Sequence, residues 1–143
     1  MNVGQTLVLS SASRYLAGVV LLTIVGIEFG GWFMTRIVRG QVAMTPFQKT
    51  FARAGHAHAG VLVTLSLVTL VLADAAALTG VLGWLARLGV PVAAALMSAG
   101  FFVSSMGRGE VVRPNRFIWL VWLGALSLAV GVATLGVGLL TTG

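Results

Sequence analysis

The sequence predicts an all-α integral membrane protein, an up-down bundle of four transmembrane helices forming one domain over residues 1–143. The first reason is composition, because 58% of the residues are hydrophobic and only 8% are charged, whereas a soluble domain carries about 25% charged residues. The second is that four apolar stretches approach the roughly 20 residues that a membrane-spanning helix needs. The third is that basic residues concentrate in two of the three connecting segments. The lipid bilayer is therefore the expected surrounding of this chain.

The first predicted span covers about residues 15–34 and is interrupted only by Glu28. No charged residue precedes Arg14. A secretory signal needs a basic start and a shorter apolar core. We therefore expect a retained transmembrane helix and not a cleaved leader.

The second span is expected over about residues 55–73, with two histidines at its start. Upstream, Thr45 and Pro46 form a typical helix start, with threonine as the N-cap and proline in the first turn. Phe47 and Phe51 are four residues apart and therefore share a face. The segment predicts either a short amphipathic helix in the membrane interface or the first turns of a long second helix.

The third span is expected over about residues 85–106, with Arg87 at its outer edge, and the fourth over about 117–140, without any charge. Short connections between the spans favour antiparallel neighbours. Membrane helices approach each other closely where small residues face the neighbouring helix. The candidates for such contacts are Gly26, Gly30, Ala57, Gly60, Ala95, Ala99, Gly100, Gly124 and Gly131.

The charge of the connecting segments predicts the orientation in the membrane. Two segments hold seven basic residues, which are Arg36, Arg39, Lys49, Arg53, Arg108, Arg113 and Arg116. Only Arg14 and Arg87 lie toward the opposite side. Because basic residues concentrate on cytoplasmic loops, both termini are expected on the non-cytoplasmic side of a bacterial-type inner (plasma) membrane. The same asymmetry explains the net charge of +6, so no nucleic-acid partner is expected.

Glu28, His56 and His58 form the one chemically unusual group in the sequence. Ionisable residues inside a membrane are costly and are functional candidates by default. Glu28 lies six residues before the end of the first span, which is about 9 Å along a helix. Both histidines enter the second span from that same side. We therefore expect a cofactor or metal site from these three residues near the cytoplasmic mouth of the bundle.

Helix geometry restricts how the two histidines can act. Residues two apart on an α-helix point about 200° away from each other. His56 and His58 therefore cannot both face one centre if their helix is regular. We expect one histidine to face the bundle interior and pair with Glu28, while the other points toward a different neighbour.

Several functions are compatible with this group. In the first, His56, His58 and Glu28 bind copper, iron, zinc or haem for redox-linked chemistry, because imidazole suits each of these metals. Two histidines on one helix do not favour a bis-histidine haem within one protomer, which leaves histidine–methionine ligation or a site shared by a homodimer. In the second, the residues act in a small proton-coupled transporter or channel that works as a dimer, since histidine titrates near neutral pH.

A third reading assigns the three residues a structural role in a non-catalytic accessory subunit or scaffold of a larger membrane complex. Quinone- or lipid-linked chemistry at the same residues is also open. An enzyme is not indicated, because the sequence shows no phosphate loop, dinucleotide fingerprint or catalytic triad. The absence of cysteine excludes thiolate metal sites and cysteine catalysis in this chain.

Overall fold

The described part of the chain, residues 8–141, is built from four long helices. They are α1 (Ser11–Val38), α2 (Pro46–Ala75), α3 (Gly80–Ser104) and α4 (Trp119–Thr141), and a short 3-10 helix, η1 (Arg116–Ile118), precedes α4. No strand occurs in residues 8–141 of this computed structural model. All four helices are long and apolar enough to cross a membrane. The predicted fold class, an all-α membrane protein with four spans, is therefore confirmed.

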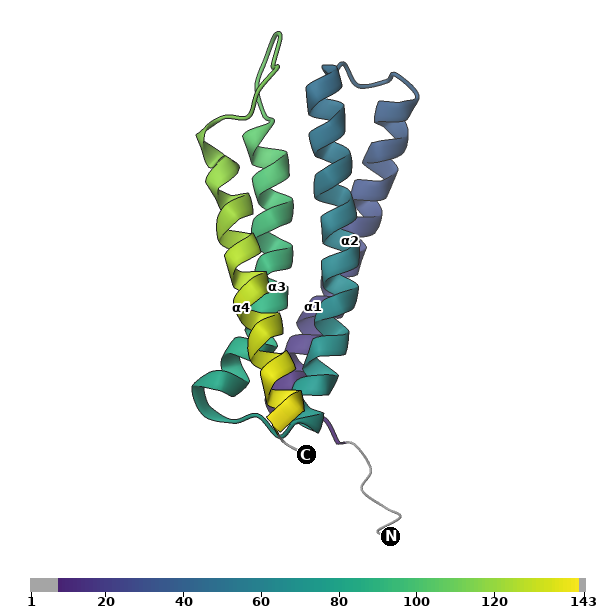
Figure 1. The fold of residues 1–143 in the computed structure, drawn as a ribbon. Coiled ribbons are helices and arrows are strands. Elements are labelled where there is room, and N and C mark those ends of the chain that lie inside the picture. Colours follow the sequence, from purple (N-terminus) through teal and green to yellow (C-terminus); the bar gives the residue numbers. More distant parts are fainter. Residues whose placement is uncertain (1–7, 142–143) are drawn as a thin grey trace.

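The helices run up and down, and each packs against its neighbour in sequence (Figure 1). The most extensive packing joins α3 to α4 and α2 to α3, whereas α1 packs against α2. No substantial contact joins α1 to α4. The ring of helices is therefore not closed between the first and the last helix.

The hydrophobic core is formed mainly by α2 and α3, with partly buried residues of α4 packed against it. Its buried members are Val20, Leu62, Val63, Val90, Ala93, Ala94 and Met97. Along the whole of α1, only Ser13, Val20 and Ile37 are buried. Ile27 is partly buried against this core, whereas most of the other large apolar side chains of α1 are exposed, and a bilayer would solvate these as well as a protein core would.

The start of α2 confirms the predicted helix cap. The hydroxyl of Thr45 accepts a hydrogen bond from the backbone N–H of Gln48 (3.2 Å), and the Gln48 side chain accepts one from the backbone N–H of Thr45 (3.0 Å). This reciprocal capping box satisfies two backbone donors that a helix start leaves free. Because α2 is continuous from Pro46, the segment forms the first turns of a long second helix and not a separate interfacial helix.

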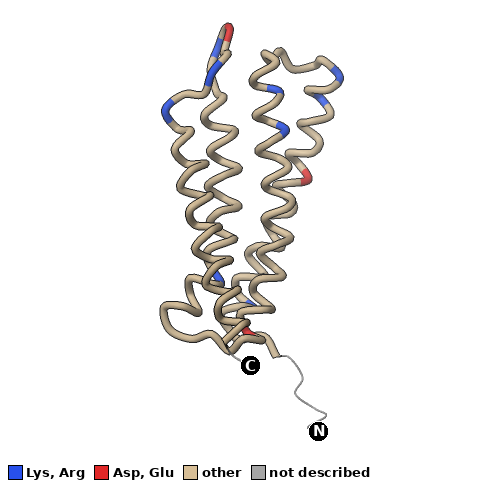
Figure 2. The backbone as a smooth tube through the Cα atoms, in the orientation of Figure 1, with Lys and Arg blue, Asp and Glu red and all other residues tan. Residues whose placement is uncertain are grey.

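The two longer connections lie at one end of the molecule, which we call the basic end. Figure 2 shows Lys and Arg gathered there, while the start of α1 and the end of α4 lie at the opposite end, the terminal end (Figure 1). The two connections are tied together, because the Gln48 amide donates to the carbonyl of Ser105 (3.1 Å) and the Thr45 hydroxyl donates to that of Val111 (2.6 Å). The start of α2 therefore also fixes the loop that follows α3.

Small residues bring α3 and α4 together. A methyl group on Gly131 would lie only 2.7 Å from the Cα of Gly89, so glycine is required where these backbones touch. Gly124 is similarly covered by Met97. In contrast, Gly26 and Gly60 have no side-chain or neighbouring-helix atom within 4 Å of an added methyl group. The predicted close contacts at Gly124 and Gly131 are therefore formed, and those at Gly26 and Gly60 are not formed within the described chain.

Candidate functional site

His56 points from α2 toward α1. A methyl group on Gly30 would lie 3.3 Å from Nδ1 of His56, and one on Gly31 would lie 3.6 Å from its Cε1. A methyl group on Gly31 would make an ordinary van der Waals contact with the imidazole, and one on Gly30 a slightly tight contact, so the ring packs directly against α1 at these two positions. The half-buried ring of His56 is thus seated in the seam between α1 and α2 because α1 carries two consecutive glycines there.

His58 points to the other side of α2. Its Nδ1 lies 2.7 Å from the carbonyl oxygen of Ala54, one turn earlier, and donates a hydrogen bond to it. Its ring stacks on Phe101 of α3 with centroids 4.9 Å apart, and Phe101 in turn meets Phe51 edge to face. His58 also lines a cavity of about 310 Å³ with Met97. The opposite directions of the two histidines are those that their spacing predicts.

A shallow, open depression of about 720 Å³ lies along the surface of α2 beside His56, and α2 alone lines it. Its lining residues are His56, Ala57, Gly60, Val61, Thr64, Leu65 and Val68. The hydroxyl of Thr64 already donates to the carbonyl of Gly60 (3.0 Å). Space is left around Gly60, which lies one turn beyond His56 on the same side of the helix. His56 is the one lining residue with an imidazole, and the edge of the ring that carries both nitrogens faces Gly30 and Gly31 of α1.

Glu28 lies exposed on α1, three residues before Gly31. Within residues 8–141 its carboxylate forms neither an ion pair nor a hydrogen bond, so the expected pairing with a histidine is not formed inside the protomer. The described residues also contain no group of three or more histidine, aspartate or glutamate side chains that could hold a metal ion. The reason is geometric, because the two histidines leave α2 on opposite sides.

The terminal end contains an ion pair that the sequence interpretation did not find. Nη2 of Arg87 lies 2.6 Å from Oδ1 of Asp74, and the two side chains are only 11% and 5% exposed. The other carboxylate oxygen of Asp74 accepts from the backbone N–H of Ser10 (2.8 Å). Nε of Arg87 donates to the hydroxyl of the buried Ser13 (3.1 Å). These bonds connect α1, α2 and α3.

Arg87 donates two further hydrogen bonds. Its Nη1 donates to the backbone carbonyls of Leu78 and Gly83, both at 3.0 Å. Four of the five guanidinium N–H groups are therefore bonded, and a buried ion pair held by such additional hydrogen bonds is typical of a structural link. The sequence carried a signal for it, namely two opposite charges on either side of the short α2–α3 connection in a chain with very few charges.

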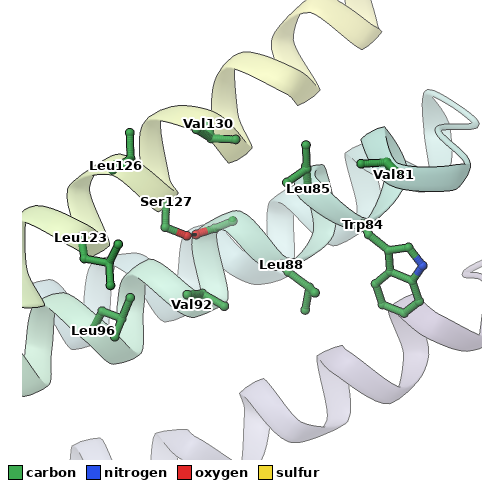
Figure 3. Close-up of a pocket in the computed structure, with 11 residues that line it drawn as sticks. Val81, Trp84, Leu85, Leu88, Val92, Leu96, Leu123, Leu126, Ser127 and Val130 are labelled. Carbon is green, nitrogen blue, oxygen red and sulfur yellow. Dashed lines mark hydrogen bonds between the residues drawn. The ribbon is translucent and has the colours of Figure 1, made fainter.

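Two further cavities lie between the helices. One, of about 350 Å³, is enclosed by α1, α2 and α3 and lined in part by Ser98, whose buried hydroxyl has no hydrogen-bond partner within the described chain. The other, of about 490 Å³, is a groove between α3 and α4 (Figure 3). Its one side-chain hydroxyl, that of Ser127, donates to the carbonyl of Gly89 (2.9 Å). This groove is an apolar surface suited to lipid chains.

Comparison with protein-family models, with curated proteins and with solved structures found no match for this chain. A fold of four membrane helices supports many different activities, so it does not define one. The function has to be argued from the residues of the site.

Proposed function

We propose that this chain is a haem-binding membrane protein in which His56 supplies an axial ligand from α2. The observation that supports this function is His56 itself, an imidazole without a hydrogen-bond partner in the described chain that borders an open depression of about 720 Å³ on α2. Sites for cofactors have volumes of about 300–1,000 Å³ and are mostly apolar, with a few polar groups that fix the ligand. The depression has a volume in this range and a mostly apolar lining, and because α2 alone lines it, lipid or a second protein chain would have to cover the other face of the haem.

The ligand set favours haem over a bare metal ion. Zinc and copper sites in proteins are built from three or four side-chain ligands, and residues 8–141 bring no three such groups together. A haem brings its own equatorial nitrogens and takes one or two axial ligands from the protein. A single histidine beside an open depression therefore suffices for haem, which when bound supplies one-electron or gas-binding chemistry.

The residues around His56 leave room for a flat ligand. Gly60 follows His56 by one turn on the same side of α2 and leaves open space where a side chain would stand. Gly30 and Gly31 border the imidazole from the α1 side. Because the chain has no cysteine, covalent attachment through thioethers is not available, and the haem would be held by ligation and packing alone.

Reconstitution with hemin tests this function. The full chain, purified in mild detergent, is expected to give a Soret band on titration with hemin, with saturation at a defined stoichiometry. His56→Ala should abolish the band because the axial ligand is removed. Gly60→Leu should also abolish it, because its side chain fills space that is empty in the structure, and for the same reason it should leave thermal stability nearly unchanged.

His58→Ala is the matched control, since it removes a histidine two residues away whose ring is stacked and whose Nδ1–H is already bonded. It should keep the Soret band, while the loss of the stacked ring lowers the unfolding midpoint. Equal hemin binding by His56→Ala and the wild type would overturn the proposal. So would a wild type that binds no hemin, or a loss of binding in His58→Ala alone.

A role as a subunit of a larger membrane assembly is a second candidate. It is favoured by α1, which has one main helix neighbour and carries the exposed, unpaired Glu28. A carboxylate facing lipid costs a few kcal/mol, and a second transmembrane chain, either another copy or a different protein, would remove that cost. In this case Glu28→Gln should weaken co-purification of the partner in mild detergent. A wild type that elutes alone as a monomer would contradict it.

We further infer that the protein resides in a bacterial-type inner membrane with the basic end in the cytoplasm. Seven basic residues at that end, against two at the other, support this orientation. The depression beside His56 would then open toward the cytoplasmic half of the bilayer.

A further inference from the structure

We infer that two copies of this chain pair through the outer face of α1, with Glu28 of each copy hydrogen-bonded to Glu28 of the other. This inference rests on the second candidate function, of which it specifies the partner and the surface, and it does not depend on haem binding. Apart from α2, no helix packs substantially against α1. The face of α1 that points away from α2 is therefore free to receive a second chain.

This outer face carries a regular stripe of exposed residues. Its members are alternately three and four residues apart, which is the spacing along the contact between two helices of a left-handed coiled coil. Most transmembrane bundles pack with the same geometry. We call these residues the outer stripe; they are Gly18, Leu21, Val25, Glu28, Trp32 and Thr35, and all six are exposed. Arg14 and Arg39 continue the spacing at the two ends of α1, where water can solvate their charges.

Glu28 is the one charged member of the outer stripe. The midpoint of α1 (Ser11–Val38) lies between Ile24 and Val25, so Glu28 is about 5 Å from it at 1.5 Å per residue. This depth lies inside a hydrocarbon core about 30 Å thick, where a charge that faces lipid is costly. Glu28 forms no ion pair or hydrogen bond within residues 8–141. The protomer alone therefore leaves this carboxylate unsatisfied.

A second copy supplies a partner for Glu28 at the same depth. All copies cross the membrane in one orientation, so the α1 helices of two copies run parallel. A twofold axis along the membrane normal then places residues near the axis opposite their own counterparts. Two Glu28 side chains are self-complementary when they share one proton, because the protonated carboxyl donates an O–H and the carboxylate accepts it. A different protein would need a donor of its own at this depth.

The rest of the outer stripe can pack against its counterpart. An added methyl group on Gly18 would have no atom within 4 Å, so a neighbouring helix can come close there. Leu21 and Val25 supply apolar contacts on the side of Glu28 toward the terminal end, and Trp32 adds an aromatic surface toward the basic end. The polar pair at Glu28 would fix the register of the two helices, as single buried polar residues do in coiled coils.

Cysteine cross-linking in native membranes tests this interface, because the chain has no cysteine of its own. In the full-length protein, Leu21→Cys and Val25→Cys are each expected to form disulfide-linked dimers on oxidation with copper phenanthroline. Val19→Cys and Gly26→Cys are the matched controls, because both positions are exposed on α1. Each follows a member of the outer stripe by one residue and therefore points about 100° away from it. Both control variants should remain monomeric.

Dimer affinity isolates the contribution of Glu28. Energy transfer between copies labelled at Val112→Cys in lipid vesicles measures this affinity. Glu28→Leu is expected to weaken dimerisation about tenfold, which matches the loss of interhelical hydrogen bonding. Glu28→Gln should weaken it less, because the amide still donates and accepts but carries no charge. Glu110→Gln is the matched control, since it removes an exposed carboxylate outside α1 and should leave the affinity unchanged.

Several results would overturn the inference. They are a wild type that stays monomeric in vesicles, control cysteines that cross-link as fully as Val25→Cys, and an unchanged dimer affinity in Glu28→Leu. If the wild type does not self-associate but co-purifies with another membrane protein, the assembly role stands and the pairing of two copies is wrong. A wild type that dimerises but gives no Soret band with hemin would contradict the haem function alone.

Discussion

At the scale of single residues, the best-defined interaction is the Asp74–Arg87 pair at the terminal end. Both side chains are almost completely buried, and their hydrogen bonds extend to the backbone of Ser10 and the hydroxyl of Ser13. Three helices meet at this point. The contribution of this pair to stability can be judged by removing one partner. The other partner would then be a buried charge without water or a counter-ion.

Replacing Arg87 should therefore be strongly destabilising. Arg87→Ala is expected to lower the free energy of unfolding by about 3–5 kcal/mol, the usual effect of leaving one member of a buried pair uncompensated. Denaturant-induced unfolding in detergent micelles, followed by circular dichroism, measures this change. Arg14→Ala is the control, because Arg14 lies exposed near the same end and its loss should change stability by less than about 0.5 kcal/mol. Equal effects of the two substitutions would contradict this structural role.

The candidate site was predictable in part. That His56 and His58 point apart follows from their spacing alone, and the structure agrees. Which of them lies against α1 could not be read from the sequence, because it depends on how α2 is turned toward the glycines at positions 30 and 31 of that helix. Glu28 was expected to pair with a histidine, but α1 turns it to an exposed position. Its rotation is set by the contacts of the whole helix with α2, which local sequence does not encode.

At the scale of the helices, the α3–α4 pair depends on backbone contact. Gly89 and Gly131 lie so close that no side chain fits between them. In a membrane such close packing replaces the hydrophobic effect as the source of helix association. The small residues were visible in the sequence, but so were Gly26 and Gly60, which face open space. A small-residue motif thus shows that a close approach is possible, and only the fold shows where it occurs.

The contact between Gly89 and Gly131 predicts that two glycines of α4 will respond differently to substitution by alanine. Gly131→Ala is expected to destabilise the protein by about 1–3 kcal/mol, because the methyl group meets backbone that cannot move aside cheaply. Gly136→Ala, five residues further along α4, meets no atom within 4 Å and should be neutral or slightly stabilising, since alanine favours helix over glycine. Thermal unfolding midpoints in the same detergent give both values. Similar midpoints for the two variants would show that the α3–α4 contact differs from the one described.

At the scale of the whole molecule, the fold class was predictable because it depends on few quantities. Four apolar stretches of sufficient length and a low charge content determine a four-span helical protein, almost regardless of which apolar residues occupy each span. The open ring was not predictable, because it depends on how much surface each helix buries, and α1 buries very little. The orientation in the membrane rests on charge and can be measured directly.

Single cysteines report this orientation, since the chain has none of its own. Val112 in the α3–η1 connection is 71% exposed, and Thr79 before α3 is exposed and makes no side-chain cap hydrogen bond. In intact spheroplasts of a bacterial host, a membrane-impermeant maleimide should label Thr79→Cys and leave Val112→Cys unlabelled until the membrane is permeabilised. The reverse pattern would contradict the assignment of the basic end to the cytoplasm.

The buried ion pair also constrains the order in which the protein is completed during synthesis. Asp74 leaves the ribosome before Arg87, which follows thirteen residues later, or about one to three seconds at about 5–20 residues per second. Until then the first two helices lack the cation that joins them to the third, and α1 is held only by its contact with α2. The first helix to be made is therefore fixed at this end only after the start of the third helix has been made. A nascent chain that stops before Arg87 would present Asp74 without a counter-ion, a state that membrane quality-control proteases can recognise.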